Sequence, residues 1–213
     1  MRKCSADVNH IRLHGAVGEA PVYSHLNHGV EFYTFPLVVR RLSGAEDQVN
    51  VVAPLELLEC CGPLERESEL TVLGEVRTFN NRTGVGSRLV ISAFARELRQ
   101  EPGEDENRLE LSGTLCKTPS LRATPLGRTI CDMILAVNRR YGRADYVPCS
   151  AWGSLAHRCG GMEVGDQLRL TGRLQSRTYT KVSGDRSEER VAFEVSIMSL
   201  AAEVPTEKEE HTG

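Results

Sequence analysis

Aromatic side chains alternate with small apolar ones in one segment of the second half of the chain. The apolar set is Val147, Cys149 and Ala151. Successive side chains of a β-strand point to opposite faces, so Tyr146, Ser150 and Trp152 share the other, outer face. Exposed aromatic rings can stack against flat, unpaired nucleic-acid bases, which is worth roughly 1–3 kcal/mol per base.

Cationic side chains flank this segment. In a later segment Leu168, Leu170 and Leu174 form the inward set. Arginine neutralises phosphates and stacks on bases, whereas duplex DNA would not need the aromatic rings because its bases are already stacked. We therefore predict a site for single-stranded nucleic acid. Its candidate residues are Arg139, Arg140, Tyr141, Arg143, Tyr146, Trp152, Arg169, Arg173, Gln175, Arg177, Tyr179 and Lys181.

Each of these features has a plainer interpretation. A single tryptophan in a strand is more often a core residue, although its parity with Ser150 favours exposure. The tyrosines could instead anchor an oligomer interface, and the arginines could form a solvated face. The combination favours nucleic acid more than any one member does.

An internal repeat shows which half carries this chemistry. Residues 9–79 align with residues 107–177 at a constant offset of 98, without a gap. The positions of Tyr141, Tyr146 and Trp152 hold Ser43, Gln48 and Pro54 in the first copy. Those of Arg169, Arg173 and Arg177 hold Thr71, Glu75 and Phe79. We predict that the second repeat is the main binder, and that the first is weaker or non-binding.

Both repeats are predicted to be all-β. Each contains five segments with period-2 alternation, which favours five strands with one buried face. A short helix is expected between the third and fourth strands, over residues 54–61 and 153–160. This order is typical of the OB-fold, a five-stranded Greek-key barrel. The expected organisation is a first OB-fold over 1–98, an acidic linker over 99–106, a second OB-fold over 107–201 and a disordered polar tail over 202–213.

Charge and composition limit the function further. Residues 1–106 carry 11 Lys/Arg against 16 Asp/Glu, and residues 107–200 carry 14 against 9, so a polyanion should prefer the second repeat.

No apolar run is long enough to span a membrane and no signal peptide is apparent, so we expect a cytoplasmic protein without membrane contact. The seven cysteines form no CxxC pair, and we expect reduced thiols, no metal and no cofactor. No nucleophile elbow, P-loop or dinucleotide fingerprint occurs, so catalytic residues are not expected and we predict no enzyme.

The second repeat resembles the bacterial single-stranded DNA-binding protein family. The resemblance is carried by the motifs Asn107-x-Leu-x-Leu-x-Gly-x-Leu115, Leu135-Ala-Val-Asn-Arg139, residues 145–153 and residues 165–179. It implies base stacking by Tyr141, Tyr146, Trp152 and Tyr179. Members with two OB-folds per chain dimerise to reach four, so the resemblance also implies a homodimer. The chain ends in an acidic stretch without the family's terminal phenylalanine, which leaves recruitment of replication or repair proteins by that route in doubt.

The sequence thus predicts a non-enzymatic protein that binds single-stranded DNA with little sequence preference and protects it during replication, recombination or repair. Two alternatives stay open: a primosomal or RNA-binding OB-fold protein, and a protein-interaction scaffold that docks a partner on the aromatic face.

Overall fold

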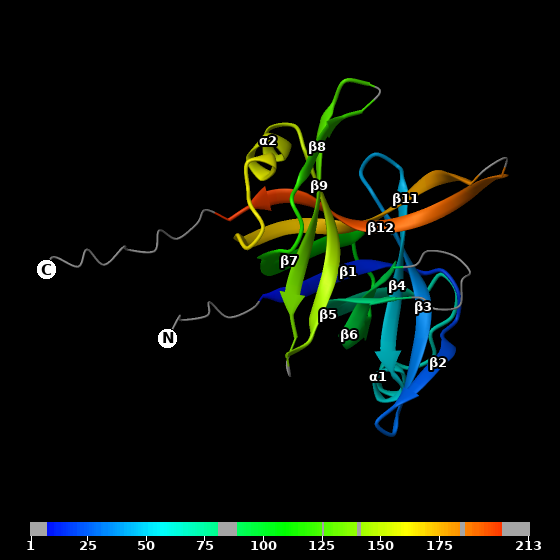
Figure 1. The fold of residues 1–213 in the computed structure, drawn as a ribbon. Helices are drawn as coiled ribbons and strands as arrows, with labels where there is room; N and C mark the ends of the chain where they lie inside the picture. Colours follow the sequence, from blue (N-terminus) through cyan, green and yellow to red (C-terminus); the bar gives the residue numbers. More distant parts are fainter. Residues whose placement is uncertain (1–7, 81–88, 125, 140–141, 184–185, 202–213) are drawn as a thin grey trace, which may run out of the picture.

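The computed structural model describes residues 8–80, 89–124, 126–139, 142–183 and 186–201. For residues 177–183, 186 and 188–191 it describes the backbone but not the side chains. Most of the described chain is strand, and its strands join in one 12-stranded sheet that closes on itself twice. Figure 1 shows the two resulting barrels, with α1 and α2 at well-separated ends of the molecule.

The first repeat forms a closed barrel. Its elements are β1 (Asn9–Val17), β2 (Val22–Asn27), β3 (Val30–Arg40), β4 (Glu46–Pro54), α1 (Leu55–Cys61), β5 (Glu69–Asn80) and β6 (Leu89–Gln100). Strand β1 pairs with both β3 and β5, β3 pairs with β4, and β6 pairs with both β4 and β5. The circuit β1–β3–β4–β6–β5 therefore has five strands and no free edge, and β2 is added outside it along β3.

The second repeat forms the same circuit. Its elements are β7 (Glu106–Leu115), β8 (Ser120–Ala123), β9 (Thr129–Asn138), β10 (Ala144–Trp152), α2 (Ser154–Gly160), β11 (Gln167–Ser183) and β12 (Arg186–Leu200). The pairings β7–β9, β9–β10, β10–β12, β12–β11 and β11–β7 close it. Beyond the barrel, β11 and β12 continue as a two-stranded arm, drawn in orange at the right of Figure 1.

Equivalent residues fill the two barrels. Leu13, Leu37 and Val72 are fully buried in the first, and Leu111, Leu135 and Leu170 occupy the corresponding places in the second. A glycine stands where each barrel bends most tightly. A Cβ on Gly74 would lie 2.1 Å from the carbonyl oxygen of Phe94, and one on Gly172 would lie 2.5 Å from that of Ser196. The strand register shifts at both glycines, as expected where a bulge turns a strand around a small barrel.

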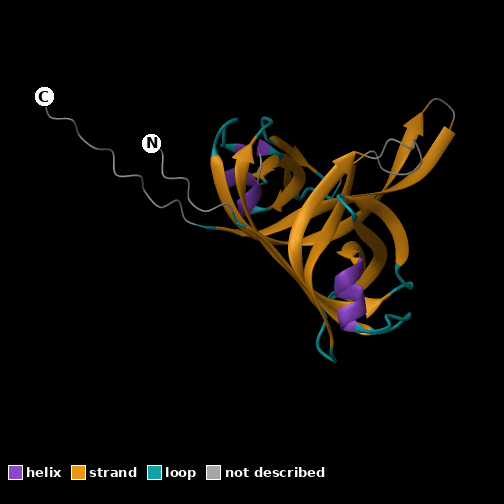
Figure 2. Cartoon of the chain, turned by 90° about the horizontal axis from the view of Figure 1, so that it is seen from below, coloured by secondary structure: helices purple, strands orange, loops and turns teal. Residues whose placement is uncertain are grey.

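The two barrels are joined by direct strand pairing. Strands β1 and β7 run antiparallel, with Asn9 opposite Leu111 and Leu13 opposite Asn107. Because Asn107 and Leu111 are the repeat equivalents of Asn9 and Leu13, the pairing has approximate two-fold symmetry. The β5 and β11 strands each reach across to the other barrel, so the repeats pack as an internal pair, seen from a second direction in Figure 2.

The structure corrects several sequence expectations. Each repeat has six strands rather than five, because β2 and β8 were missed. Every residue of both strands is exposed, so neither shows the alternation that predicts a half-buried strand. The first helix begins at Leu55, and Pro54 is its extended N-cap rather than a residue of the first turn. The boundaries 1–98, 99–106 and 107–201 remain our proposal, and residues 202–213 lie outside the described part of the chain.

None of the helices in the described ranges has the length and apolar character needed to cross a membrane.

Candidate nucleic-acid interface

Strand β10 presents two aromatic rings on the outer face of the second barrel. Tyr146 is 54% exposed and Trp152 is 40% exposed. The alternating residues Val147, Cys149 and Ala151 are buried in the core, as the period-2 pattern predicts. Burial of the apolar set fixes the strand's orientation, so the two rings face solvent without any residue of their own strand having to move.

The polar residues beside these rings are not exposed as expected. Ser150 is completely buried, and its hydroxyl donates a 3.0 Å hydrogen bond to Glu194 Oε1. Gln175 is only 9% exposed, and its Nε2 donates to the same oxygen at 3.2 Å. The expectation that Ser150 and Gln175 face solvent was therefore wrong. They belong to a buried polar cluster beneath the face, and Gln175 contributes little surface to a ligand.

Arg139 lies between the two barrels. Its guanidinium forms a two-pronged ion pair with Asp145 and donates a 3.2 Å hydrogen bond from Nη2 to the carbonyl oxygen of Thr78. Asp145 also accepts hydrogen bonds from the backbone N–H of Thr78 at 2.5 Å and from Arg77 Nη1 at 3.2 Å. While these bonds hold, the guanidinium of Arg139 stabilises the interface between the repeats and is not available to bind a phosphate.

The ionisation of Asp145 follows from this setting. Burial alone would raise the pKa of its carboxyl, but the hydrogen bond from Arg139, the backbone bond from Thr78 and the positive charge of Arg139 outweigh it. The pKa of Asp145 therefore lies below its usual range, and the carboxylate stays charged. A matching contact occurs across the two-fold axis, where Asp47 pairs with Arg41 and accepts a 3.2 Å hydrogen bond from the N–H of Ser176.

The remaining described candidates differ in their exposure and in their hydrogen-bond and ion-pair partners. Arg169 is half-exposed and pairs with Glu110 at 2.6 Å on the β7–β11 part of the sheet. Arg143 is exposed in the loop before β10. Arg173 is partly buried, and its Nε, which is itself buried, has no hydrogen-bond partner among the described residues. Arg143 is thus the exposed candidate with donors for a phosphate, and Arg173 offers only the part of its side chain that stays accessible.

Five candidates cannot be placed as side chains. Arg140 and Tyr141 lie outside the described residues. The backbone of Arg177, Tyr179 and Lys181 belongs to the β11 part of the projecting arm, and their side chains are not described. The five remain predictions.

The first barrel carries an aromatic row that the sequence reasoning missed. His25 stacks on Phe32 with ring centroids 5.0 Å apart, Phe32 packs against Phe94 at 5.6 Å, and Arg96 lies 5.0 Å over the Phe94 ring. Phe32 lies opposite Pro54, the repeat equivalent of Trp152, so the row occupies the corresponding outer face. The signal was available in the spacing of Phe94 and Arg96. Because the rings already cover one another, the row offers less free stacking area than β10.

Within the described ranges, no three His, Cys, Asp or Glu side chains are placed to hold a metal ion. Burial raises the pKa of the Cys149 thiol, and it raises that of Cys159 to about 11. Both thiols are therefore protonated at neutral pH and are poor nucleophiles.

Comparison with known proteins shows the family of the chain. The model of the Single-strand binding protein family matches residues 106–200. The chain is 34% identical over 107 residues to single-stranded DNA-binding protein 1 of Clostridium acetobutylicum, covering 46% of this chain and 97% of that protein. It is 36% identical over 101 residues to the single-stranded DNA-binding protein of Clostridium tetani, covering 43% of this chain and 70% of that protein. The chain belongs to the single-strand binding protein family.

Other relatives are longer than the matched region. The single-stranded DNA-binding protein of Thermus thermophilus is 36% identical over 104 residues, covering 47% of this chain but only 38% of that protein. The chain therefore spans well under half the length of that relative.

The fold of the whole chain is shown by a solved structure. The crystal structure of the wild-type single-stranded DNA binding protein from Thermus aquaticus matches with a TM-score of 0.74 and 23% identity, covering 98% of both chains. That likeness extends over both repeats and confirms the predicted all-β architecture of two tandem OB-folds.

Proposed function

We propose that this protein binds single-stranded DNA with little sequence preference, chiefly on the outer face of the second OB-fold. The observation that carries the proposal is the exposure of Tyr146 and Trp152 on β10, where the core-filling residues between them hold the strand in place. Every base has a flat face, so stacking on such rings tolerates any sequence. Family membership and the names of the relatives support the same ligand.

The phosphates would be met by a smaller set of cations than the sequence predicted. We assign this part to Arg143, which is exposed, and to Arg173, whose side chain is partly accessible. Arg140, Tyr141, Arg177, Tyr179 and Lys181 stay in the proposal as further contacts. We give Arg139 a positioning part instead, because its ion pair with Asp145 holds the start of β10 against the first barrel.

The wider biological role follows if the protein coats single-stranded DNA. We infer that the protein is not an enzyme and protects exposed single strands during replication, recombination or repair, in the cytoplasm. Dimerisation to four OB-folds and contacts with replication or repair proteins are part of the same proposal. RNA is the competing ligand, since an OB-fold serves both and discrimination would need a contact to the 2′-OH.

The repeat supplies a matched test. Trp152→Ala and Tyr146→Ala remove the two rings, and Pro54→Ala and Gln48→Ala change the corresponding positions of the first barrel. Binding of a fluorescein-labelled oligo-dT would be followed by anisotropy at several salt concentrations. Each ring removal should weaken binding by roughly 5- to 150-fold, which corresponds to about 1–3 kcal/mol per base, and the first-barrel variants should change it little.

Two results would overturn the proposal. One is the absence of oligo-dT binding by the unaltered protein at about 50 mM salt, where phosphate contacts are strong. The other is binding that is lost equally in the variants of both barrels.

A further inference from the structure

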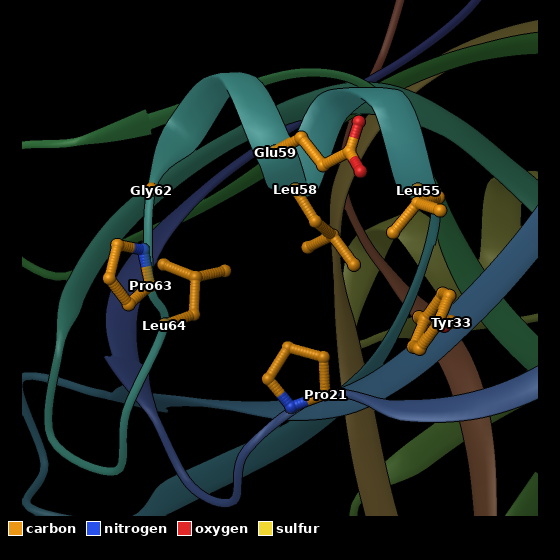
Figure 3. Close-up of a pocket in the computed structure, with 8 residues that line it drawn as sticks. All are labelled: Pro21, Tyr33, Leu55, Leu58, Glu59, Gly62, Pro63 and Leu64. Atoms are coloured by element: carbon orange, nitrogen blue, oxygen red, sulfur yellow. The ribbon is translucent and has the colours of Figure 1, made fainter.

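The first barrel has an apolar pocket that takes no part in the proposed DNA face. Figure 3 shows it between α1, the loop that follows α1 and the start of the β2–β3 hairpin. Its volume is about 380 Å³, and its walls are formed by Pro21, Tyr33, Leu55, Leu58, Pro63 and Leu64. This is enough room for a large apolar side chain, and pockets that bind ligands are mostly apolar with a few polar groups at the edge.

The second barrel differs at the corresponding place. There Leu121 of β8, although 47% exposed, packs against the end of α2, and a Cβ on Gly160 would lie 3.3 Å from Leu121 Cδ1. The equivalent residue of the first barrel is Tyr23, which is 57% exposed and packs edge-on against Tyr33 with centroids 5.9 Å apart. A Cβ on Gly62 would meet nothing within 4 Å. Tyr23 thus packs on Tyr33, whereas its counterpart Leu121 packs at the end of the helix, and the space beside Gly62 stays open.

The edge of the pocket is acidic. Glu59 lines it directly, and Glu56 is exposed one helical turn earlier on α1. Glu65 and Glu67 follow in the next loop, where the single cation, Arg66, lies 3.6 Å from Glu67. At the corresponding positions the second barrel has Ser154, His157, Glu163 and Gly165. The acidic edge thus belongs to the first barrel alone, in line with the excess of Asp and Glu over residues 1–106.

A strand edge that pairs with no other described strand lies next to the pocket. Strand β2 is the terminal strand of the sheet order, and it begins one residue after Pro21. Its exposed side chains include Val22, Tyr23 and Leu26. An open edge with apolar side chains can accept an added extended segment through backbone hydrogen bonds.

We propose that this pocket is a docking site for an extended, basic segment of a partner protein, with an apolar side chain in the pocket and flanking Lys or Arg side chains against Glu56 and Glu59. Opposite charge on the two surfaces speeds encounter and selects against acidic chains. The protein's own residues 201–213 do not fit, because they carry four Glu and one Lys. A nucleic-acid strand does not fit either, since its phosphates would face the same carboxylates. The second barrel would then bind DNA, and the first barrel would bind a protein partner.

The test uses the full chain and a defined probe. The probe is an acetylated, amidated peptide of sequence Gly-Lys-Leu-Lys-Leu-Lys-Gly, titrated into ¹⁵N-labelled protein and followed by two-dimensional NMR. Control peptides replace Leu by Ser or Lys by Glu. The test variant is the double substitution Glu56→Lys and Glu59→Lys. The matched control is Ser154→Lys with His157→Lys, which places the same side chains at the corresponding positions of α2.

We expect saturable shifts confined to residues 21–33 and 55–64 in the unaltered protein and in the matched control. The affinity should fall at least tenfold in the Glu56→Lys/Glu59→Lys variant and with either control peptide. Oligo-dT affinity of that variant should not fall, so failure of this proposal is distinguishable from failure of the DNA-binding proposal.

Four outcomes would overturn the inference. The first is the absence of a saturable chemical-shift change up to about 5 mM peptide, a limit that corresponds to very weak binding. The second is equal weakening of peptide binding in both double variants, and the third is a set of shifts that centre on α2. Concentration-dependent shifts at the pocket without peptide would show a second copy as the occupant and would also overturn it.

Discussion

The ion pair at the repeat interface allows a quantitative test of how the two barrels are held together. Asp145 is fully buried and accepts hydrogen bonds from Arg139, from Arg77 and from the backbone N–H of Thr78. Asp145→Asn keeps the shape but removes the charge and leaves one oxygen for several donors. Breaking a buried pair costs about 3–5 kcal/mol. Because the two guanidiniums are 26% and 19% exposed, we expect the lower end, about 3 kcal/mol.

Asp47→Asn is the matched control, because Asp47 lies in the corresponding contact. It is also buried, but among the side chains that the structure describes it pairs with one arginine, Arg41, and the equivalent of Arg77 is the uncharged Gln175. The difference between the variants is about one charge-assisted hydrogen bond, roughly 1.5–3 kcal/mol. Asp145→Asn should therefore destabilise the protein more than Asp47→Asn does, as measured by urea unfolding followed by circular dichroism.

The pH dependence provides a second measurement on the same variants. The pKa of Asp145 is lowered in the folded chain, so its stabilisation is fully present above the unfolded value of about 3.9 and is lost as the pH falls through the folded value. The gap between the unaltered protein and Asp145→Asn should thus close below about pH 4. An equal or larger loss in Asp47→Asn, or a gap that does not narrow in acid, would refute the reasoning.

Three further predictions concern the barrels, the thiols and the DNA face. Gly172→Ala should lower the melting temperature strongly, because its Cβ would lie 2.5 Å from a backbone oxygen, whereas Gly127→Ala at an open turn with positive φ should have a smaller effect; similar losses in calorimetry would contradict this. Iodoacetamide at pH 8 should label the exposed Cys60 and Cys116 in the native protein but not Cys149 or Cys159, whose pKa values are raised by burial; mass spectrometry showing early labelling of Cys149 would count against the described core. Arg173→Ala should reduce the slope of log affinity against log salt by about 0.7, as for one phosphate contact on a single strand, and an unchanged slope would remove Arg173 from the interface.

Parity along single strands was the part of the site that the sequence could predict. Burial of Val147, Cys149 and Ala151 follows from alternation alone, and exposure of Tyr146 and Trp152 follows from it. The repeat predicted two barrels because one fold must satisfy both copies of the same core pattern. The first inference needs only the two-residue alternation of a strand, and the second needs only the internal sequence repeat.

Contacts made across the fold could not be predicted in this way. Ser150 and Gln175 are buried together with Glu194 of β12, which lies opposite Gln175 in the β11–β12 pair and 44 residues from Ser150 in the sequence. Arg139 is held at the repeat interface because Thr78 of the other barrel accepts a hydrogen bond from it and donates one to its partner Asp145. The pairing of β1 with β7 cannot be predicted from the alternation of apolar and polar residues, because each strand already has a buried face in its own barrel. Strands β2 and β8 gave no signal because neither buries a residue.

The most direct test of the account uses the single tryptophan of the chain as its own reporter. Oligo-dT would be titrated into the unaltered protein while the fluorescence of Trp152 is recorded at low and at high salt. The account predicts strong quenching that saturates and weakens as salt rises, because bases stack on the exposed ring while phosphates release counterions. Saturable binding by anisotropy without any change in Trp152 fluorescence would contradict the assignment of the β10 face as the DNA site.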